Sequence, residues 1–403
     1  MRILIAHNHY RQPGGEDAVV KSEFELLKMF GEDVRLYERN NDDWENASWR
    51  VKWQAARDTV WSRSSYDDFR RTLKDFRPDV VHFHNIFYAL SPSVYQACRD
   101  EGVSVVQSLH NFRLMCANGL FFRQGRVCED CLPHRRWQGI LHRCYHNSVL
   151  VTGAVVRMMD VHWSRGTWLN QVDRFVTATD FTRQKYATAG IPAEKIAVKP
   201  NFVYPDPGYR REENGGALFV GRLSGEKGVG TLLDAWDNTM PLPLTVIGGG
   251  PEEEHLKSEA ARRGLKNVDF PGYVSPEEYD RRMRRAAVLI VPSVCYENFP
   301  RIVAEAFAYG VPVLASRLGS LAEIIEDNQT GRFFEPGQPR DLAGQVRWFA
   351  DHPGETHHMG RRARDVFEKT YSAEENYRRL KDIYQSVIPA KRSDGLAQRL
   401  SAA

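Results

Sequence analysis

From Val288 to Ser316 the chain reads VLIVPSVCYENFPRIVAEAFAYGVPVLAS, which predicts a buried strand, a loop, a helix and a second buried strand. Residues 288–291 form a short, apolar and mostly β-branched run. Pro300 suits the start of a helix, and Gly310 suits its C-terminal end, before the apolar residues 311–315. A strand, a helix and a further strand in this order form the repeating unit of an α/β fold.

Two glutamates lie beside the start of this predicted helix. Glu297 precedes Pro300, and Glu305 falls one to two turns inside the helix. A helix N-terminus carries unpaired N–H groups and partial positive charge, which suits phosphate, whereas carboxylates accept hydrogen bonds from hydroxyl pairs. A sugar nucleotide, with a diphosphate between two polyols, fits both features. An isolated pair of glutamates at this spacing is more often a solvated cap and a surface residue. The other motifs of the chain therefore decide between this interpretation and a ligand-binding site.

Length and composition indicate two domains. The chain has 403 residues, enough for two ordinary domains with full cores. Its formal net charge is +3, divided into about +5 for residues 1–200 and about −2 for the remainder, and its mean hydropathy is −0.50. This weak asymmetry hints at an anionic partner and falls far short of the basic footprint of a nucleic-acid-binding protein.

The N-terminal residues 1–7 are too short an apolar run for a signal peptide and predict a first strand instead. No segment approaches the roughly eighteen apolar residues of a membrane span. We therefore expect a cytoplasmic protein that contacts a membrane only peripherally, at its inner face. The six cysteines are then expected to be reduced thiols or metal ligands.

Alternating strands and helices predict a doubly wound parallel sheet in the first half of the chain. Buried strands are expected at 78–84 and 103–109, and His110 follows the second directly. Ligands of such sheets bind beyond the carboxyl ends of the strands, where His110 is expected to lie. A single histidine there is more often structural than ligand-binding.

Gly14 and Gly15 precede a helical pattern that runs from Asp17 to about Phe30. Glycines at a helix entry let the backbone approach a phosphate or an acceptor group closely. By themselves two glycines more often form an ordinary turn.

The segment 41–76 interleaves tryptophans with basic residues, and Trp49 and Trp53 share one helical face. Two interpretations are open. The helix either lies on an anionic membrane surface or buries its tryptophans against the domain, and the second is favoured. If the acceptor is lipid-linked, this segment is the predicted membrane contact.

Four cysteines fall within a short, loop-like stretch: Cys116, Cys128, Cys131 and Cys144. This spacing is compatible with a tetrahedral four-cysteine zinc site, and it is equally compatible with reduced thiols packed in a loop. A site closed by four thiolates leaves zinc no open position, so a zinc ion here is expected to be structural.

The second half of the chain carries two glycine-rich loops. A strand expected at 217–220 is followed by Gly221-Arg-Leu-Ser-Gly-Glu-Lys-Gly228, in which Arg222 and Lys227 can neutralise phosphate charge. A later glycine run around Gly249 leaves room for a nucleotide base.

These motifs resemble those of the retaining glycosyltransferases of family 4, which have the GT-B fold. The resemblance rests on Gly-Arg-Leu and Glu-Lys-Gly within 221–228 and on the pair Glu297 and Glu305, and it extends in order along almost the whole chain. It implies two facing Rossmann-like domains with a cleft between them. The expected parts are an acceptor-binding domain at 1–200 with a Cys-rich loop at 111–148, a linker at 201–216, a nucleotide-sugar-binding domain at 217–370, a helix at 371–389 that crosses back to the first domain, and a tail at 390–403.

The resemblance also implies roles for site residues. Arg222 and Lys227 would stabilise the leaving diphosphate. Glu297 would bind hydroxyls of the donor sugar, Glu305 would bind the ribose, and His110 would orient the sugar from across the cleft. The other residues expected to bind the donor are Gly14, Gly15, Gly221, Gly249, Asn298, Phe299 and Pro300.

The implied reaction moves a sugar from a nucleotide diphosphate to a hydroxyl of a glycan or lipid-linked acceptor, with retention, in surface polysaccharide biosynthesis. No Asp-x-Asp pair suits a bridging metal, so we expect fixed cations to replace one and no cofactor to be required. The resemblance implies that the leaving phosphate takes the acceptor proton, while double displacement through Glu297 stays open. A GT-B sugar-nucleotide epimerase or phosphorylase and a non-catalytic scaffold also stay open, although the complete motif set argues against them.

Overall fold

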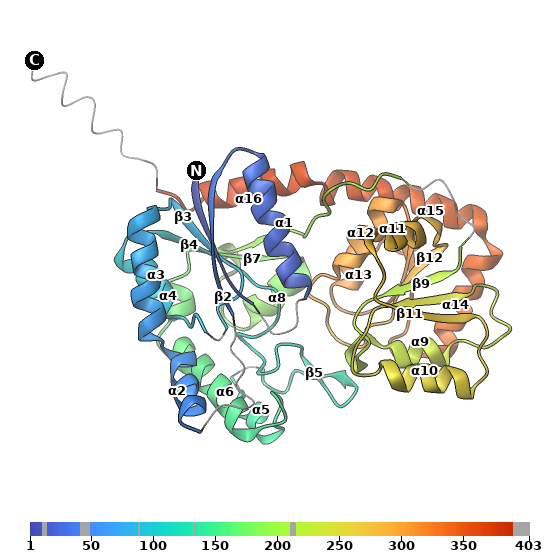
Figure 1. Ribbon diagram of the computed structural model, residues 1–403, viewed down its shortest axis with the longest axis horizontal. Coiled ribbons are helices and arrows are strands. Elements are labelled where there is room, and N and C mark those ends of the chain that lie inside the picture. The colour runs from blue at the N-terminus through green and yellow to red at the C-terminus, as the bar shows by residue number, and fades with distance from the viewer. Residues whose placement is uncertain (10–13, 41–48, 88, 133, 210–214, 390–403) are drawn as a thin grey trace, which may run out of the picture.

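The computed structural model describes residues 1–9, 14–40, 49–87, 89–132, 134–209 and 215–389. They form two α/β domains that face each other, and a long helical segment crosses from the second domain back to the first, as predicted (Figure 1). The predicted tail at 390–403 and the charged part of the predicted linker at 210–214 lie outside the described residues.

The first domain is built on a six-stranded parallel sheet with the order β2-β1-β3-β4-β7-β8. The order reverses between β1 and β3, so the loops that follow these strands open at a topological switch point, where such sheets bind ligands. The strands are β1 (Arg2–His9), β2 (Asp33–Asn40), β3 (Val80–Phe83), β4 (Ser104–Ser108), β7 (Arg174–Thr177) and β8 (Ile196–Val198).

Helices cover both faces of this sheet, and side-chain alternation along β1 supplies both cores. Leu4 and Ala6 belong to the larger core, and Ile3 and Ile5 to the smaller one beneath α1 and α16. The first-domain helices are α1 (Gly15–Met29), α2 (Trp49–Val60), α3 (Arg63–Phe76), α4 (Ser93–Asp100), α5 (Trp137–Leu141), α6 (Val149–Ser164), α7 (Thr167–Asn170), α8 (Asp180–Thr188) and the 3-10 turn η1 (Ala193–Lys195).

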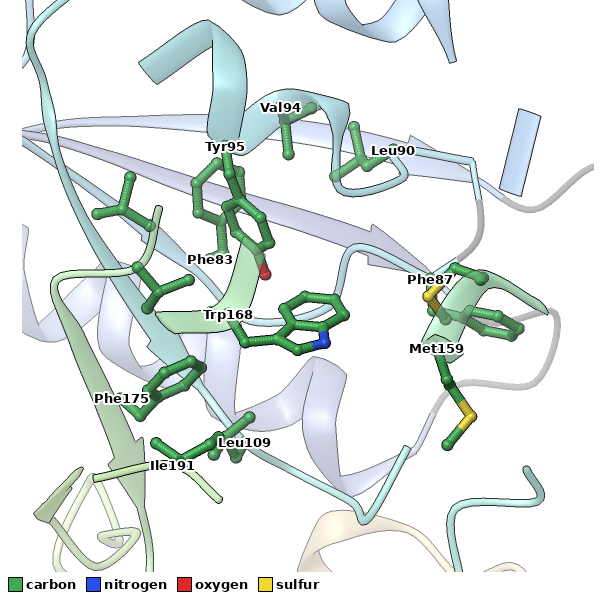
Figure 2. Close-up of a cluster of buried hydrophobic side chains, with 14 of the residues drawn as sticks. Phe83, Phe87, Leu90, Val94, Tyr95, Leu109, Met159, Trp168, Phe175 and Ile191 are labelled. Carbon is green, nitrogen blue, oxygen red and sulfur yellow. The ribbon is translucent and has the colours of Figure 1, made fainter. Parts of the chain in front are cut away.

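Aromatic side chains fill the larger core. Figure 2 shows Trp168 of α7 among Tyr95, Phe83 and Phe175, and the Tyr95 and Trp168 ring centroids lie 6.0 Å apart. All four side chains are buried. This core anchors the strands whose carboxyl ends face the second domain.

The second domain repeats the plan with the strand order β11-β10-β9-β12-β13-β14. Its order reverses between β9 and β12, which places the two glycine-rich loops and the 288–316 segment at one edge. The strands are β9 (Ala217–Val220), β10 (Leu244–Ile247), β11 (Val268–Gly272), β12 (Val288–Val291), β13 (Val313–Ser316) and β14 (Gly331–Phe334).

The segment 288–316 forms β12, α12 and β13 as the sequence predicts. Pro300 is the N-cap of α12, and Gly310 ends it with a φ of 73°, a left-handed conformation that favours glycine. The helical elements of this domain are η2 (Gly225–Lys227), α9 (Val229–Asp234), α10 (Glu253–Arg262), α11 (Pro276–Arg285), α12 (Arg301–Tyr309), α13 (Leu321–Ile324), α14 (Pro339–Asp351) and α15 (Pro353–Val366).

The crossover continues from α15 through the π-helical turn η3 (Phe367–Tyr371) to α16 (Ala373–Gln385), which lies beside α1 of the first domain (Figure 1). Polar contacts fix it there. The Tyr384 hydroxyl lies 2.8 Å from His82 Nδ1, and Ser104 Oγ donates a hydrogen bond of 2.8 Å to the Val387 carbonyl. The crossover therefore belongs to the cores of both domains.

The Cys-rich loop contains the hairpin of β5 (Phe122–Arg123) and β6 (Arg126–Val127), followed by α5. In the segment predicted to touch a membrane, Trp44 and the side chains of Trp49 and Trp53 lie outside the described residues, and Trp61 packs against the first-domain core. Among the described helices, none combines the length and the apolar character needed to cross a bilayer.

Candidate active site

A cleft of about 1390 Å³ lies between the two domains, at the carboxyl ends of the parallel strands. It collects motifs that are up to about 290 residues apart in sequence. All the residues predicted to bind the donor line it except Glu305. They are Gly14, Gly15, His110, Gly221, Arg222, Lys227, Gly249, Glu297, Asn298, Phe299 and Pro300.

An ion pair stands on the second-domain wall of the cleft. Lys227 Nζ donates a hydrogen bond of 2.7 Å to Glu297 Oε1, and Ser293 Oγ donates one of 2.6 Å to the same oxygen. Burial alone would raise the pKa of Glu297, but the Lys227 charge and the Ser293 hydroxyl hold it below its usual value. Burial likewise disfavours the Lys227 cation, but Glu297 raises the pKa of Lys227 above its usual value. Both groups are therefore charged at neutral pH.

Arg222 provides a second cation beside this pair. It lies at the exposed edge of the cleft, and its side chain has no hydrogen bond or ion pair with any residue that the structure describes. The loop that carries it is held by its backbone: Gly221 N–H donates to the Ile247 carbonyl, and Leu223 N–H donates to the Gly249 carbonyl, each at 3.0 Å. A guanidinium on a fixed loop with no protein partner is available to an anion.

Gly228 ends this loop and cannot be replaced without strain. It is left-handed, with a φ of 69°, and an added Cβ would lie 1.9 Å from the Pro292 carbonyl oxygen. Close packing of the loop against the end of β12 is therefore what brings Lys227 to Glu297.

Glu305 lies just behind the cleft wall. It forms an ion pair with Arg301, with Nε and Oε1 3.1 Å apart, and it accepts a hydrogen bond from the Tyr279 hydroxyl. Arg301 and Tyr279 both line the cleft. The Glu305 carboxylate is thus oriented by two neighbours and lies one side chain away from the cavity.

Gly249 and Tyr273 lie against each other in the cleft lining. A Cβ at position 249 would lie 2.8 Å from the Tyr273 ring, so glycine is what allows the ring to sit there. Tyr273 is 85% exposed and lines the cleft. An exposed ring against a glycine backbone can stack on a planar ligand.

The segment before α12 joins the domains as well as lining the cleft. Asn298 Nδ2 donates a hydrogen bond of 2.7 Å to the Leu109 carbonyl, and its Oδ1 accepts one of 2.8 Å from Thr182. Phe299 is buried and packs against Tyr371. The side chain of Asn298 is therefore engaged by the first domain, while the N-terminus of α12 remains at the cavity.

His110 faces this wall from the first domain and heads a buried polar chain. Its Nε2 lies 2.9 Å from His84 Nδ1, and His84 Nε2 lies 3.3 Å from Glu23 Oε2. Lys199 Nζ donates a hydrogen bond of 2.6 Å to Glu23 Oε1 and one of 3.3 Å to Asn376 of α16. The chain ties His110 to α1 and to the crossover helix.

The electrostatics of this chain keep His110 neutral. Burial lowers the pKa of His110 well below its usual range, and the neighbouring His84 adds to this effect. Burial opposes ionisation of Glu23, yet Lys199 and the histidines hold its pKa well below the usual value. A neutral imidazole in the cleft can accept or donate a hydrogen bond to a sugar hydroxyl without adding charge.

Gly14 and Gly15 lie at the entry of α1, on the opposite rim. An added Cβ would meet no atom of the described residues within 4 Å at either position, so the described part of the fold does not require glycine there. Glu16 beside them also lines the cleft, and burial together with Asp17 raises its pKa from 4.5 to about 8, although Arg113 opposes the shift. This rim is therefore open and carries a protonated carboxyl at neutral pH.

Two groups in the described part of the chain bring three ligand atoms within 4.8 Å of one another: His7, His9 and Asp17, and Glu23, His82 and His84. Protein partners account for both. Asp17 bonds to both histidines, at 3.0 and 2.8 Å, and Glu23 already neutralises the Lys199 ammonium.

The cysteines of the Cys-rich loop are free and form no group of this kind among the described residues. Several of these cysteines nevertheless make close contacts with the backbone of the same loop. Cys128 N–H donates to the Phe121 carbonyl at 2.7 Å, Cys144 N–H donates to Gly139 at 3.0 Å, and a Cβ on Gly139 would lie 3.9 Å from Cys131 Sγ. Tetrahedral zinc, with Zn–S distances of about 2.3 Å, would need the thiols of Cys116, Cys128, Cys131 and Cys144 to draw closer together.

Sequence reasoning missed several residues of the cleft. Ser293 follows the end of β12 at the ligand-binding edge, a position that could have indicated it. Glu23 and His84 carry no local signal, because their contacts with Lys199 and His110 join distant parts of the chain.

Two family models match the chain. One described as a glycosyl transferase 4-like domain covers residues 14–201, and one described as glycosyl transferases group 1 covers residues 208–366. The first range contains the first-domain sheet apart from β1, and the second contains the whole second-domain sheet; each carries residues of one wall of the cleft.

Among curated proteins, the D-rhamnosyltransferase WbpZ of Pseudomonas aeruginosa is 29% identical over 250 residues, which cover 57% of this chain and 63% of WbpZ. Glycogen synthase of Mycobacterium tuberculosis is 35% identical over 305 residues, which cover 73% of this chain and 65% of that enzyme. The chain therefore spans less than two thirds of the length of either relative.

Among solved structures, Anabaena HepE in complex with UDP matches with a TM-score of 0.66 and 16% identity, over 96% of this chain and 100% of that chain. At this identity the likeness concerns the fold. The two sheets, the cleft between them and the two family models together show that the chain belongs to the GT-B glycosyltransferases of the family 4 type.

Proposed function

We propose that this protein transfers a sugar from a nucleotide diphosphate sugar to a hydroxyl of a glycan or lipid-linked acceptor, with retention at the anomeric carbon, in surface polysaccharide assembly. The observation that carries this function is a convergence of positive charge on one wall of the cleft. Arg222 has no partner among the described residues, Lys227 lies beside it in the same loop, and the N-terminus of α12 opens on the same cavity. A diphosphate is the ligand that this wall suits.

The relatives support this choice. WbpZ is named a D-rhamnosyltransferase, the mycobacterial relative is a glycogen synthase, and HepE was solved with UDP. All three names involve sugar transfer or a nucleoside diphosphate. They leave the donor base, the sugar and the acceptor of this chain to be measured.

Each polar group has a role in the proposed reaction. Arg222, Lys227 and the α12 N-terminus stabilise charge that develops on the leaving diphosphate, so that fixed cations supply what a bridging metal supplies elsewhere. Glu297 binds hydroxyls of the donor sugar, and Glu305 binds the ribose. Neutral His110 orients the sugar from the first domain, with His84 behind it.

Retention is proposed to proceed with the leaving phosphate as the proton acceptor. Oε1 of Glu297 accepts hydrogen bonds from both Lys227 and Ser293, which makes this oxygen less nucleophilic. Double displacement through Glu297 predicts a covalent sugar adduct on this residue. Mass spectrometry of the protein during turnover should detect no such adduct.

The four cysteines are proposed to be structural. The cleft lining includes Gly119 and Leu120 from the Cys-rich loop but none of its cysteines. Metal analysis of the purified protein distinguishes a zinc site from packed, reduced thiols. A zinc site gives about one zinc per chain, lost in Cys131→Ser, whereas packed thiols give none.

The proposed reaction is tested by incubating the protein with UDP-, GDP-, ADP- and dTDP-sugars and following release of nucleoside diphosphate. A single preferred donor is expected to be slowly hydrolysed without an acceptor. Proton NMR of the first product then reports the anomeric configuration, which should match that of the donor. Inversion would exclude the retaining mechanism, and a released epimer would indicate an epimerase.

A further inference from the structure

Five large apolar side chains are exposed within a stretch of fifteen residues in the first domain. They are half of the ten exposed large apolar side chains in the described part of the chain. We call them the α5–α6 surface. Its members are Trp137 (55% exposed), Leu141 (63%), Val149 (45%), Leu150 (85%) and Val151 (42%).

The fold holds these side chains together on one edge. Trp137 and Leu141 are four residues apart in α5 and therefore share one face of it. Ser148 caps α6 through a hydrogen bond from Val151 N–H, so 149–151 form its first turn. Figure 1 shows α5 and α6 side by side at the lower edge of the first domain, away from α16, and the two helices contact each other.

Contacts between the two helices fix the surface. Arg136 Nε donates a hydrogen bond of 2.6 Å to Asp160 of α6, and Tyr145 N–H donates one of 3.1 Å to Thr152 Oγ1. The apolar side chains are therefore presented by a rigid support rather than by a free loop.

The unpaired charge around this surface is positive, because Asp160 is already bonded to Arg136. Residues 131–159 contain four arginines and neither aspartate nor glutamate. Arg135, Arg143 and Arg157 are exposed. The acidic residues just before this stretch are already paired, Glu129 with Lys185 and Asp130 with Arg123.

We infer that the α5–α6 surface docks on an anionic lipid bilayer. Trp and Leu side chains enter the boundary between headgroups and acyl chains, while arginines beside them reach the lipid phosphates. Each arginine near such a surface adds to binding, and the effect falls off within a Debye length. Docking needs neither a membrane span nor a bound donor, so it stands independently of the proposed reaction.

A bilayer fits this surface better than a second copy of the chain. Two copies meeting through it would place arginines against arginines with no acidic residue of the surface to compensate. A bilayer supplies both the apolar phase and the negative charge. The same Cys-rich loop lines the cleft with Gly119 and Leu120, so docking would bring the cleft close to the lipid phase.

The test is sedimentation of the full-length protein with vesicles of phosphatidylcholine alone and of phosphatidylcholine with about 30% phosphatidylglycerol. The wild type is expected to bind the anionic vesicles and to release them in 0.5 M salt. Leu141→Ser/Leu150→Ser and Arg135→Glu/Arg143→Glu should each weaken binding at least about tenfold. Because these side chains are exposed, both variants should keep the wild-type melting temperature.

Matched controls separate local from general effects. Met29→Ser removes an exposed apolar side chain from α1, and Arg361→Glu/Arg362→Glu makes the same charge change on exposed residues of α15. Both should bind as the wild type does. Docking at this surface is overturned if the wild type ignores anionic vesicles, if the controls lose as much binding as the test variants, or if light scattering shows a dimer that Leu141→Ser/Leu150→Ser dissociates.

Discussion

Lys227 Nζ and Glu297 Oε1 lie 2.7 Å apart in the cleft, although the two residues are separated by 70 positions in the chain. The pair joins the first glycine-rich loop of the second domain to the segment before α12. In the proposed donor complex, this cation and this anion would lie where the diphosphate joins the sugar. We therefore expect the balance between the two charges to govern how the diphosphate and sugar halves of a donor bind.

Replacing Glu297 with Gln should affect diphosphate binding and sugar transfer differently. The change removes a negative charge beside the phosphate site, so a nucleoside diphosphate should bind at least as tightly as in the wild type. Sugar transfer should fall by about 10- to 100-fold, because the sugar hydroxyls lose a charged acceptor. Calorimetry with the diphosphate and initial rates with the full donor measure the two effects.

Glu305→Gln is the matched comparison, since it makes the same chemical change behind the cleft wall. The ribose hydroxyls then lose a charged acceptor with two oxygens, and binding of the nucleoside diphosphate itself should weaken by about tenfold or more. If both variants changed binding and transfer in the same proportion, the separate roles of Glu297 and Glu305 would be wrong.

Alanine substitutions of Gly14 in the first domain and Gly228 in the second should have very different effects on stability. Gly14→Ala should leave stability unchanged within about 0.5 kcal/mol, since none of the described residues lies within 4 Å of the new Cβ, and should weaken binding of donor or acceptor at the rim of the cleft. Gly228→Ala should destabilise the protein by roughly 2–4 kcal/mol, because of its left-handed φ and the Pro292 carbonyl. Denaturant unfolding and ligand titration of both variants provide the check.

Glu16 should make stability fall with rising pH. Its pKa is raised from 4.5 to about 8 in the folded protein, so between these values the unfolded chain releases the proton while the folded chain keeps it. Glu16→Gln removes this dependence. Its melting temperature should exceed that of the wild type by an amount that grows from pH 5 to pH 8, equivalent to roughly 1–3 kcal/mol.

Glu25→Gln, on the exposed side of the same helix, serves as the control for this pH series and should follow the wild-type curve. A constant offset between Glu16→Gln and the wild type at every pH would mean that the Glu16 carboxyl does not titrate in this range.

Removing only one charge of the Glu23–Lys199 pair should lower the free energy of unfolding strongly. Both side chains are almost fully buried, so Glu23→Gln leaves an uncompensated ammonium and should cost roughly 3–5 kcal/mol. Adding Lys199→Met should restore more than about half of the loss. Equal stabilities for the single and double variants in denaturant unfolding would show that the charge of Lys199 is not what Glu23 compensates.

Local patterns predicted much of this fold. The β12–α12–β13 unit follows from an apolar run, Pro300 and Gly310, all of which act within a few residues. Likewise Thr179, a residue type that favours helix N-caps, accepts a hydrogen bond from Thr182 N–H at the start of α8. Short-range sterics and capping decide such features, and a sequence displays them directly.

Contacts between distant segments could not be predicted in this way. A buried series of polar contacts links His110 to Lys199 through His84 and Glu23. These residues lie in or beside α1, β3, β4 and β8, and only the packed sheet brings them together. The sequence also predicts that Asn298 binds the donor. It does not predict the hydrogen bonds of Asn298 with Leu109 and Thr182, which tie the two domains. Tertiary packing fixes these partners, and no spacing along the chain encodes them.

The most direct test of donor binding compares the rise in melting temperature that each sugar nucleotide causes in the wild type, in Lys227→Ala and in Lys257→Ala. Lys257 forms a partly exposed ion pair with Glu253 and controls for loss of a lysine. We expect one donor to raise the wild-type and Lys257→Ala melting temperatures by several degrees and to leave Lys227→Ala unchanged. An undiminished rise in Lys227→Ala, or no rise with any sugar nucleotide in the wild type, would contradict a donor site at Lys227.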